Sequence, residues 1–369
     1  MIFTDVLIVG GGPAGASLSQ FLKDRGISSI VIERFGKNRN KICAGGIPLA
    51  INALLPQRLQ NFEKVEYDSL EIFYKSRLTA RSSKKVLFSY GVKRSDFDSY
   101  LRIGIDVRYH ENFLNFEKTN NKILARTDKG DYSAKFLVGA DGVGSKVSLL
   151  SGLAPKKRFI VAEEAEVPAE VRYKNTLKIF LGYNSIGYGW IFPKNGFLSV
   201  GSGSLKSRFR KGTVFSFYPG QYKAKIYPIS LWGGEEVLHK GRVALVGEAA
   251  NLVDPFSAGG IYPAVLSSFL LSEVIAKSLK NGRTSLEEYE KLLNDKLYPN
   301  FRYALFLSRM FYPFLPFVKK YVVKSSTIDL ALELTSKGYI SYEEFYKKVH
   351  ASKHIALKAA YFIIKKFFG

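Results

Sequence analysis

FTDVLIVGGGPAG (residues 3–15) is the stretch that decides the fold. An apolar strand at 3–9 runs into the spacing G-x-G-x-x-G, and a helix is expected from Ala14 to Arg25. Gly10 permits a tight turn, Gly12 lets backbone amides approach a pyrophosphate, and Gly15 allows close contact between helix and strand. The first helical turn, with Pro13 and Ala14, offers partial positive charge to phosphates. The pattern predicts a dinucleotide site; a purely structural glycine turn is the alternative.

A second apolar strand at Ser28 to Ile32 completes a βαβ unit and ends at Glu33. Glu33 lies 18 positions after Gly15, where an acidic side chain can accept hydrogen bonds from the ribose hydroxyls of an adenosine. We expect Glu33 and the adjacent Arg34 to bind the cofactor. An acidic residue here disfavours a 2′-phosphate.

Composition and net charge narrow the range of possible functions and partners. The chain has 369 residues, 46% of them hydrophobic, so a large core is available and disorder is excluded as the dominant state. Its net charge of +23 makes nucleic acid, an anionic membrane or a phosphorylated substrate plausible partners. The single cysteine, Cys43, excludes an internal disulfide and favours a reducing, cytoplasmic setting. We expect no metal site. The apolar runs at 311–318 and 355–364 are too short to span a membrane.

Two later segments place a carboxylate just after an apolar strand. They are Gly139-Ala140-Asp141-Gly142 and Gly247-Glu248-Ala249-Ala250. The ends of parallel strands gather ligands at one edge of a sheet. Together with the first motif, they resemble the flavoproteins of the p-hydroxybenzoate hydroxylase fold. That resemblance implies FAD, with Asp141 at the cofactor and Glu248 on the ribityl chain. The family normally has Asp where this chain has Glu248.

Three further motifs resemble those of the geranylgeranyl reductases. They are Lys41-x-Cys43-Ala44-Gly45-Gly46, then Tyr188-Gly-Trp190-Ile-Phe192-Pro193-Lys194 with Gly201, and Asp254-Pro-Phe-Ser-Ala-Gly259-Gly260-Ile261-Tyr262. The resemblance implies that the first and third approach the flavin, through Cys43, Ala44, Gly46, Gly259, Gly260 and Ile261. We also expect Arg94 and Phe113 at the cofactor. The resemblance to the geranylgeranyl reductases further implies substrate binding by Tyr188, Trp190, Phe192, Pro193 and Lys194, and catalytic roles for Cys43, Tyr188 and Trp190.

Each of these motifs has a simpler interpretation. The alternating aromatic side chains of 188–192 would also fill the face of a packed sheet, and whether they face a cavity separates the two readings. Cys43 could be a small core residue, which is the commonest role of a free cysteine. The lysine-rich segment 355–368 has the composition of a helix lying on anionic lipid, or of a solvated helix packed on the body.

The expected fold class is α/β, with a Rossmann-like FAD-binding domain, an inserted antiparallel-sheet substrate domain and a C-terminal helical region. We assign 1–65, 92–155 and 240–284 to the FAD-binding domain, 66–91 and 156–239 to the substrate domain, and 285–369 to the helical region. Capping boxes at Ser285-x-x-Glu288 and Ser341-x-x-Glu344 predict two helix starts in that last region.

The resemblance implies an FAD-dependent reductase that saturates carbon–carbon double bonds of geranylgeranyl chains, on archaeal-type membrane lipid precursors or a related prenyl substrate. A monooxygenase of the same fold, acting on an aromatic or isoprenoid compound, is the first alternative; a non-catalytic flavin or lipid carrier is the second. We expect electrons from NAD(P)H or a ferredoxin, peripheral contact with an anionic membrane, and no nucleic-acid partner.

Overall fold

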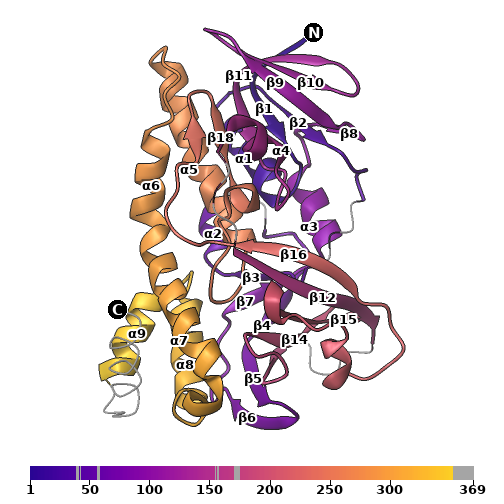
Figure 1. Cartoon of the computed structure of the whole chain (residues 1–369), viewed down its shortest axis with the longest axis vertical. Coiled ribbons are helices and arrows are strands. Elements are labelled where there is room, and N and C mark those ends of the chain that lie inside the picture. The colour runs from indigo at the N-terminus through magenta and orange to yellow at the C-terminus, as the bar shows by residue number, and fades with distance from the viewer. Residues whose placement is uncertain are drawn as a thin grey trace.

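The computed structural model describes residues 1–38, 41, 43–55, 59–153, 155, 158–169 and 175–351. Figure 1 shows the region around the N-terminal strands at the top, a second sheet below it, and the last helices along one side. The segment 355–368, predicted to lie on lipid or to pack on the body, is outside the described residues.

The N-terminal βαβ unit forms as the sequence predicts. Strand β1 (Ile2–Val9) leads into helix α1 (Pro13–Lys23), and β2 (Ser29–Glu33) returns parallel to β1. The last four residues of β1 are buried, which is why this strand reads as a continuous apolar run. Its carboxyl end therefore delivers the glycine loop to the edge of the sheet.

The first sheet is mixed. Its main path runs β17-β18-β11-β1-β2-β8, and the hairpin β9–β10 joins it antiparallel to β11. Its other strands are β8 (Asp106–Tyr109), β9 (Phe113–Lys118), β10 (Ile123–Thr127), β11 (Asp131–Gly139), β17 (His239–Lys240) and β18 (Val243–Leu245). Because β11 and β18 run parallel to β1, the ends of these strands bring Gly10, Asp141 and Glu248 to one region.

The second sheet runs in the order β16-β12-β15-β14-β13-β5-β6. Its strands are β5 (Ser69–Tyr74), β6 (Arg77–Arg81), β12 (Arg158–Pro168), β13 (Thr176–Leu181), β14 (Gly187–Lys194), β15 (Phe197–Leu205) and β16 (Lys225–Leu231). Neighbours pair antiparallel except β13 and β5, which are parallel. The expected α/β fold class, with a Rossmann-like sheet, a second and largely antiparallel sheet and C-terminal helices, is confirmed.

Several smaller elements connect the two sheets. A small sheet, β3-β7-β4, joins β3 (Gly46–Pro48), β7 (Ser89–Gly91) and β4 (Val65–Tyr67). The segment 66–91, assigned from sequence to the substrate domain, thus supplies β5 and β6 to the second sheet, but its two ends, in β4 and β7, pair with each other, and β7 also pairs with β3. The short helices are α2 (Ile51–Leu54), α3 (Arg94–Leu101), α4 (Lys146–Ser151) and the 3-10 turns η1 (Lys206–Arg208), η2 (Thr213–Ser216) and η3 (Gly247–Ala250).

Helix α5 (Ile261–Lys280) packs along α1 in the main core. Among the described residues it is long and apolar enough to cross a membrane, but 72% of its apolar window is buried inside the protein. The following helices are α6 (Glu288–Lys296), α7 (Tyr298–Val322), α8 (Ser325–Ser336) and α9 (Tyr342–Ala351).

The two predicted capping boxes have different outcomes. Ser341 caps α9, and its Oγ accepts a hydrogen bond from the amide of Glu344 at 3.2 Å. The prediction at Ser285 is wrong, because α6 begins only at Glu288. The carbonyl of Ser285 instead accepts a 2.5 Å hydrogen bond from the Ser278 hydroxyl of α5, so the turn between the helices uses this residue.

Candidate functional site

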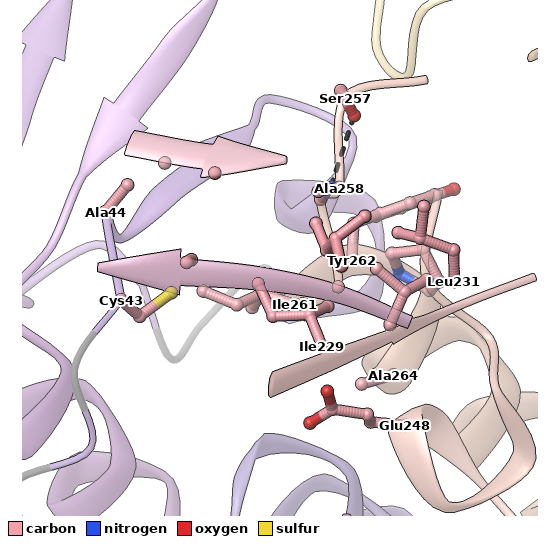
Figure 2. Close-up of a pocket in the computed structure, with 18 of the residues that line it drawn as sticks. Cys43, Ala44, Ile229, Leu231, Glu248, Ser257, Ala258, Ile261, Tyr262 and Ala264 are labelled. Atoms are coloured by element: carbon pink, nitrogen blue, oxygen red, sulfur yellow. Dashed lines mark hydrogen bonds between the residues drawn. The ribbon is translucent and has the colours of Figure 1, made fainter. Parts of the chain in front are cut away.

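One large cavity, of about 900 Å³, runs from the glycine loop to the C-terminal helices. Figure 2 shows part of its wall, with Cys43 and Ala44 on one side and Tyr262, Ala264 and Glu248 on the other. Every site residue proposed from the sequence lines this cavity except Gly15, Pro193 and Lys194. The structure thus brings together residues that lie far apart in the sequence, and their individual roles stay predictions.

The glycine loop has the conformation that its spacing predicts. Gly10 has φ +105°, and a Cβ there would lie 2.4 Å from the carbonyl oxygen of Ala140. A Cβ on Gly15 would lie 1.9 Å from the carbonyl oxygen of Gly10, so helix α1 could not pack this closely on the loop with any other residue. Gly12 is the N-cap residue of α1 and has no side chain that could bond the first backbone amides of the helix. These amides therefore remain available to a ligand in the cavity, which Gly12, Pro13 and Ala14 line.

Glu33 is buried at the end of β2 and holds this loop. Its Oε2 accepts a hydrogen bond from the amide of Gly11 at 2.9 Å, and its Oε1 accepts one from the amide of Phe35 at 2.9 Å. Each carboxylate oxygen has a second lone pair, so the predicted contact with ribose hydroxyls is compatible with these bonds. The backbone amides fix the position of the carboxylate beside the cavity.

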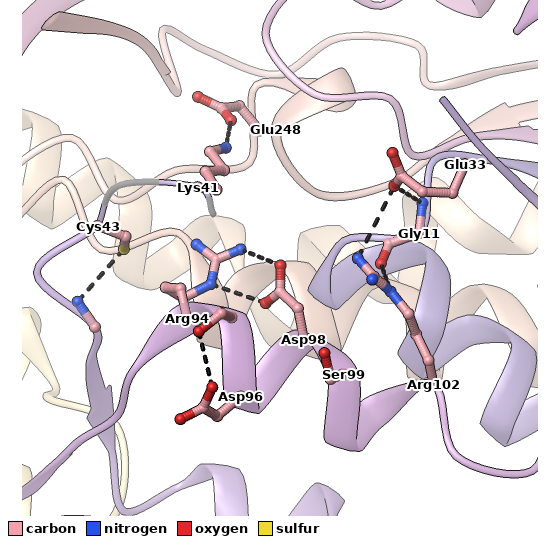
Figure 3. A network of polar contacts seen from close by, with 12 residues as sticks. Gly11, Glu33, Lys41, Cys43, Arg94, Asp96, Asp98, Ser99, Arg102 and Glu248 are labelled. Carbon is pink, nitrogen blue, oxygen red and sulfur yellow. Dashed lines mark hydrogen bonds and ion pairs between the residues drawn. The ribbon is translucent and has the colours of Figure 1, made fainter. Parts of the chain in front are cut away.

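Arg102 is a residue that the sequence analysis missed. Its Nε donates to the carbonyl of Gly11 at 2.7 Å, and its Nη2 lies 4.0 Å from Oε2 of Glu33 (Figure 3). Its side chain is 2% exposed. Arg102 lies 91 positions from Gly11 in the sequence and belongs to no motif or periodic pattern, so nothing in the sequence predicts this contact.

Glu248 is held by groups from three parts of the chain. Its Oε2 accepts a hydrogen bond from Nζ of Lys41 at 3.0 Å and lies 3.3 Å from the hydroxyl of Tyr227, while the amide of Ser230 lies 3.4 Å from Oε1. Burial lowers the pKa of Lys41, but Glu248 and Tyr227 together outweigh it, and the pKa lies above its usual value. The longer Glu side chain is thus anchored at the cavity wall by the lysine of the Lys41–Gly46 motif.

Arg94 begins helix α3 and is fully engaged beside Cys43. Its Nε and Nη2 donate to the two carboxylate oxygens of Asp98, each at 2.9 Å (Figure 3). Burial lowers the pKa of Arg94, whereas Asp98 and then Cys43 raise it, and the net shift is upward. Sγ of Cys43 accepts a hydrogen bond from the amide of Gly45 at 3.4 Å. Cys43 therefore faces the cavity next to a permanent positive charge.

The aromatic stripe of β14 forms one wall of the cavity. Tyr188, Trp190 and Phe192 alternate along the strand and all line it, which answers the question of whether the wall faces a cavity or solid packing. The Tyr188 hydroxyl donates to the carbonyl of Ser257 at 2.6 Å, and burial raises the pKa of this phenol. Tyr188 thereby ties the second sheet to the loop that precedes α5.

Helices α7 to α9 supply the opposite wall, although no motif of the sequence pointed to them. Their side chains in the cavity are mostly apolar: Leu307, Phe311, Tyr312, Val323, Ile328, Ala331, Leu332, Tyr339, Ile340, Tyr342 and Phe345. An amphipathic period indicates which face of a helix is buried, but not what lies opposite it. These helices therefore enclose the cavity and give it the form of a tunnel.

Comparison with known proteins agrees with this geometry. The profile of a family described as FAD binding domain matches residues 3–48. The chain is 27% identical to digeranylgeranylglycerophospholipid reductase of Methanocaldococcus jannaschii, over 80% of this chain and 83% of that protein. It is 26% identical to the chloroplastic geranylgeranyl diphosphate reductase of Arabidopsis thaliana, over 93% and 80%.

The chain is an FAD-dependent oxidoreductase related to the geranylgeranyl reductases. Its fold matches that of a geranylgeranyl bacteriochlorophyll reductase-like protein from Thermoplasma acidophilum, with a TM-score of 0.79, 21% identity and 99% of both chains covered. A p-nitrophenol 4-monooxygenase from Pseudomonas putida aligns with a TM-score of 0.71 at 15% identity, over 94% and 99%. The resemblance stated from sequence is confirmed, and FAD is the cofactor.

The residues of this oxidoreductase fit an FAD molecule. The cradle at Gly10 and Gly15 leaves no room for a side chain, as a closely bound pyrophosphate requires. Oδ2 of Asp141 accepts the amide of Lys146 at 2.7 Å, whereas Oδ1 is buried and lacks a partner among the described groups. Burial raises the pKa of Asp141. A donor group of a bound ligand would satisfy that oxygen. Among the described residues, no three His, Cys, Asp or Glu side chains are grouped as metal ligands.

Two buried ionisable groups lie beside the aromatic wall of the oxidoreductase. Burial raises the pKa of Glu164 to about 7 and lowers the pKa of Lys194 to about 7. Oε1 of Glu164 accepts from the Ser199 hydroxyl at 2.6 Å, and Ser199 accepts from Nε1 of Trp190 at 3.2 Å. Lys194 lies against the rings of Tyr67 and Phe192, and its Nζ lacks a hydrogen-bond partner among the described groups. Because both pKa values lie near 7, Glu164 and Lys194 can each gain or lose a proton near neutral pH.

Proposed function

We propose that this oxidoreductase saturates carbon–carbon double bonds of geranylgeranyl chains carried by membrane lipid precursors. The observation that carries the proposal is the continuity of one cavity, which joins the glycine loop at one end to an apolar tunnel between β14 and helices α7 to α9. Burial of one methylene contributes about 0.8 kcal/mol, so such a wall can bind a long prenyl chain without polar contacts.

Reduced FAD, when bound, supplies a hydride from its N5 atom to an alkene carbon. The amides at the start of α5, after Gly259 and Gly260, would hold the negatively charged edge of the reduced ring. Glu248 would hold the ribityl chain, and Lys41 keeps that carboxylate oriented. Isolated alkenes are poor hydride acceptors, so the tunnel contributes chiefly by fixing the double bond and excluding water.

A proton must reach the second alkene carbon. Cys43 faces the cavity beside Arg94, and Cys43 or a water held near it is our proposed source. Tyr188 is a weaker candidate, because its hydroxyl donates to the carbonyl of Ser257 and its pKa is raised. We assign Tyr188 to positioning the Ser257–Gly260 loop, and Trp190 and Phe192 to holding the substrate.

We further propose a cytoplasmic enzyme that touches the inner face of the membrane and receives electrons from NAD(P)H or a ferredoxin. The net charge of +23 favours both an anionic lipid surface and a small acidic redox protein. No nucleic-acid partner is proposed.

The test is mass spectrometry of prenyl lipids after anaerobic incubation with dithionite-reduced protein. Each saturated double bond adds two hydrogen atoms to the lipid, and the flavin is reoxidised in step. A product that contains an added oxygen atom and forms only in air would identify a monooxygenase instead. Protein that keeps its reduced flavin in the presence of every prenyl lipid would be a carrier.

A further inference from the structure

Arg158 is a cationic residue of the cavity whose charge the proposed function does not use. It is the first residue of β12, and its side chain lines the cavity in the same alternating row as Ile160, Ala162 and Glu164. Nη1 of Arg158 is buried and has no hydrogen-bond partner among the described groups. The other cavity cations near the cofactor are satisfied, since Lys41 pairs with Glu248 and Arg94 with Asp98.

A second arginine lies close to Arg158. Arg309 is exposed on α7, directly after Ser308, which lines the cavity. Burial and then the positive charge of Arg309 lower the pKa of Arg158. No carboxylate among the described residues contributes to that shift. Two like charges without a counter-charge repel each other, and a bound anion would remove that cost.

Arg158 also marks an end of the tunnel. In the second sheet it lies opposite Leu231 of the edge strand β16, and the next residues of its row are apolar. Glu164 is six residues further along β12, roughly 20 Å away for an extended strand. Arg158 is partly exposed and Arg309 is exposed, so a ligand bound by both guanidinium groups would lie at the surface end of this row.

We propose that Arg158 and Arg309 bind the phosphate group of the prenyl substrate, so that its polar end stays at this mouth and its chain lies in the tunnel. The inference rests on the proposed function and adds the substrate's ionic end and its orientation. Guanidinium groups match phosphate oxygens by paired hydrogen bonds, which an uncharged prenol could not make.

The test compares geranylgeranyl diphosphate with uncharged geranylgeraniol, using dithionite-reduced protein without oxygen. For Arg158→Gln and Arg309→Gln we expect KM for the diphosphate to rise roughly ten- to a hundredfold, since each variant loses a hydrogen bond to a charged group. KM for geranylgeraniol should change less than about twofold. Arg158→Lys should retain most of the binding. Arg126→Gln removes an exposed arginine of β10 and serves as the matched control, with no change for either substrate.

Equal losses for both substrates, or none for either, would overturn the inference. Calorimetry of the oxidised holoprotein with the diphosphate gives a second measure, in which the affinity of Arg158→Gln must fall by the same factor. This measurement needs no turnover, so it still tests the arginine pair if no prenyl chain is reduced and the proposed function fails. Should Arg158→Gln not fold, Arg309→Gln alone decides, because that side chain is exposed.

Two further measurements distinguish the phosphate of a prenyl substrate from free phosphate and from the headgroup of a membrane lipid. Inorganic pyrophosphate should compete only weakly, because the prenyl chain supplies much of the affinity; competition as strong as that of the diphosphate would indicate a site for free phosphate. Anionic vesicles without prenyl lipid should sediment wild type and Arg158→Gln alike. A loss of vesicle binding with unchanged KM for the diphosphate would move the arginine pair to the membrane surface and overturn the inference.

Discussion

Replacing Glu164 by glutamine tests whether the tunnel wall is built around a carboxyl group that burial keeps neutral. The side chain lies in the cavity row of β12 and accepts a 2.6 Å hydrogen bond from Ser199, which in turn holds Trp190. Glutamine has nearly the same shape, and its carbonyl oxygen can accept the same hydrogen bond. The variant therefore removes the titration while it keeps the packing of the wall.

The sign and size of the change in folding stability follow from the pKa of Glu164. Burial, opposed by the Ser199 hydrogen bond and the charge of Lys194, raises the pKa of Glu164 from 4.5 to about 7. Between these two values the unfolded chain has lost the proton and the folded chain has kept it, so the folded state loses stability as pH rises. The shift corresponds to about 3 kcal/mol. Glu164→Gln should gain that amount over wild type at pH 8 and little at pH 5.

The assay is urea unfolding of the FAD-loaded proteins at half-unit steps from pH 5 to pH 8, followed by circular dichroism and flavin fluorescence. Glu117→Gln is the matched control, since Glu117 is exposed on β9, in the other sheet. Its pH profile should follow that of wild type. Parallel profiles for wild type and Glu164→Gln would refute the idea that burial controls this carboxyl group.

Four other substitutions test single contacts. Gly15→Ala should abolish flavin retention, read from the ratio of absorbance at 450 and 280 nm, because its Cβ would lie 1.9 Å from a carbonyl oxygen; Gly26→Ala, strained at φ +70° but in open space, should keep the flavin. Arg102→Gln should weaken FAD binding by roughly 1.5 to 3 kcal/mol in fluorescence titration, because it removes a buried 2.7 Å hydrogen bond to the carbonyl of Gly11 and a positive charge 4.0 Å from Glu33. Cys43→Ala should keep FAD but slow turnover, and unchanged kinetics would return this cysteine to the core. Tyr188→Phe should retain FAD and lose roughly tenfold in kcat, measured by anaerobic flavin reoxidation, because the Ser257 loop loses a 2.6 Å hydrogen bond.

The parts of the site that the sequence predicted are those encoded by local geometry. Gly15 is required by its close approach to Gly10 within one βαβ unit, so their spacing carries this information, whereas Gly10 also approaches the distant Ala140. The alternation of Tyr188, Trp190 and Phe192 identifies one face of a strand in the same way. Resemblance to a family was needed to name the cofactor and the substrate class, and to expect Cys43, Asp141, Glu248 and Gly260 at the flavin.

The parts that the sequence did not predict depend on contacts between distant segments. Arg102 reaches Gly11 across 91 positions, and Lys41 reaches Glu248 across 207. Neither contact has a periodic or motif signature. The C-terminal wall is a similar case, because helices α7 to α9 reveal an apolar face but not the sheet that it meets. Ser285 shows the converse, where a local capping pattern is overridden by a hydrogen bond to the neighbouring helix.

Asp254 explains why the cofactor end and the tunnel end of the cavity form one physical unit. Its buried Oδ1 accepts the amides of Phe256 and Ser257 at 2.8 and 2.9 Å, and its Oδ2 accepts the hydroxyl of Tyr339 at 2.7 Å. Burial raises the pKa of Asp254 despite these donors. Tyr312 of α7 donates to the carbonyl of Phe256 at 2.8 Å. The loop that carries Gly259 and Gly260 along the cavity is therefore fixed by the C-terminal segment that lines the tunnel. Loosening that segment must disturb both ends of the cavity, because the same buried carboxylate orders them.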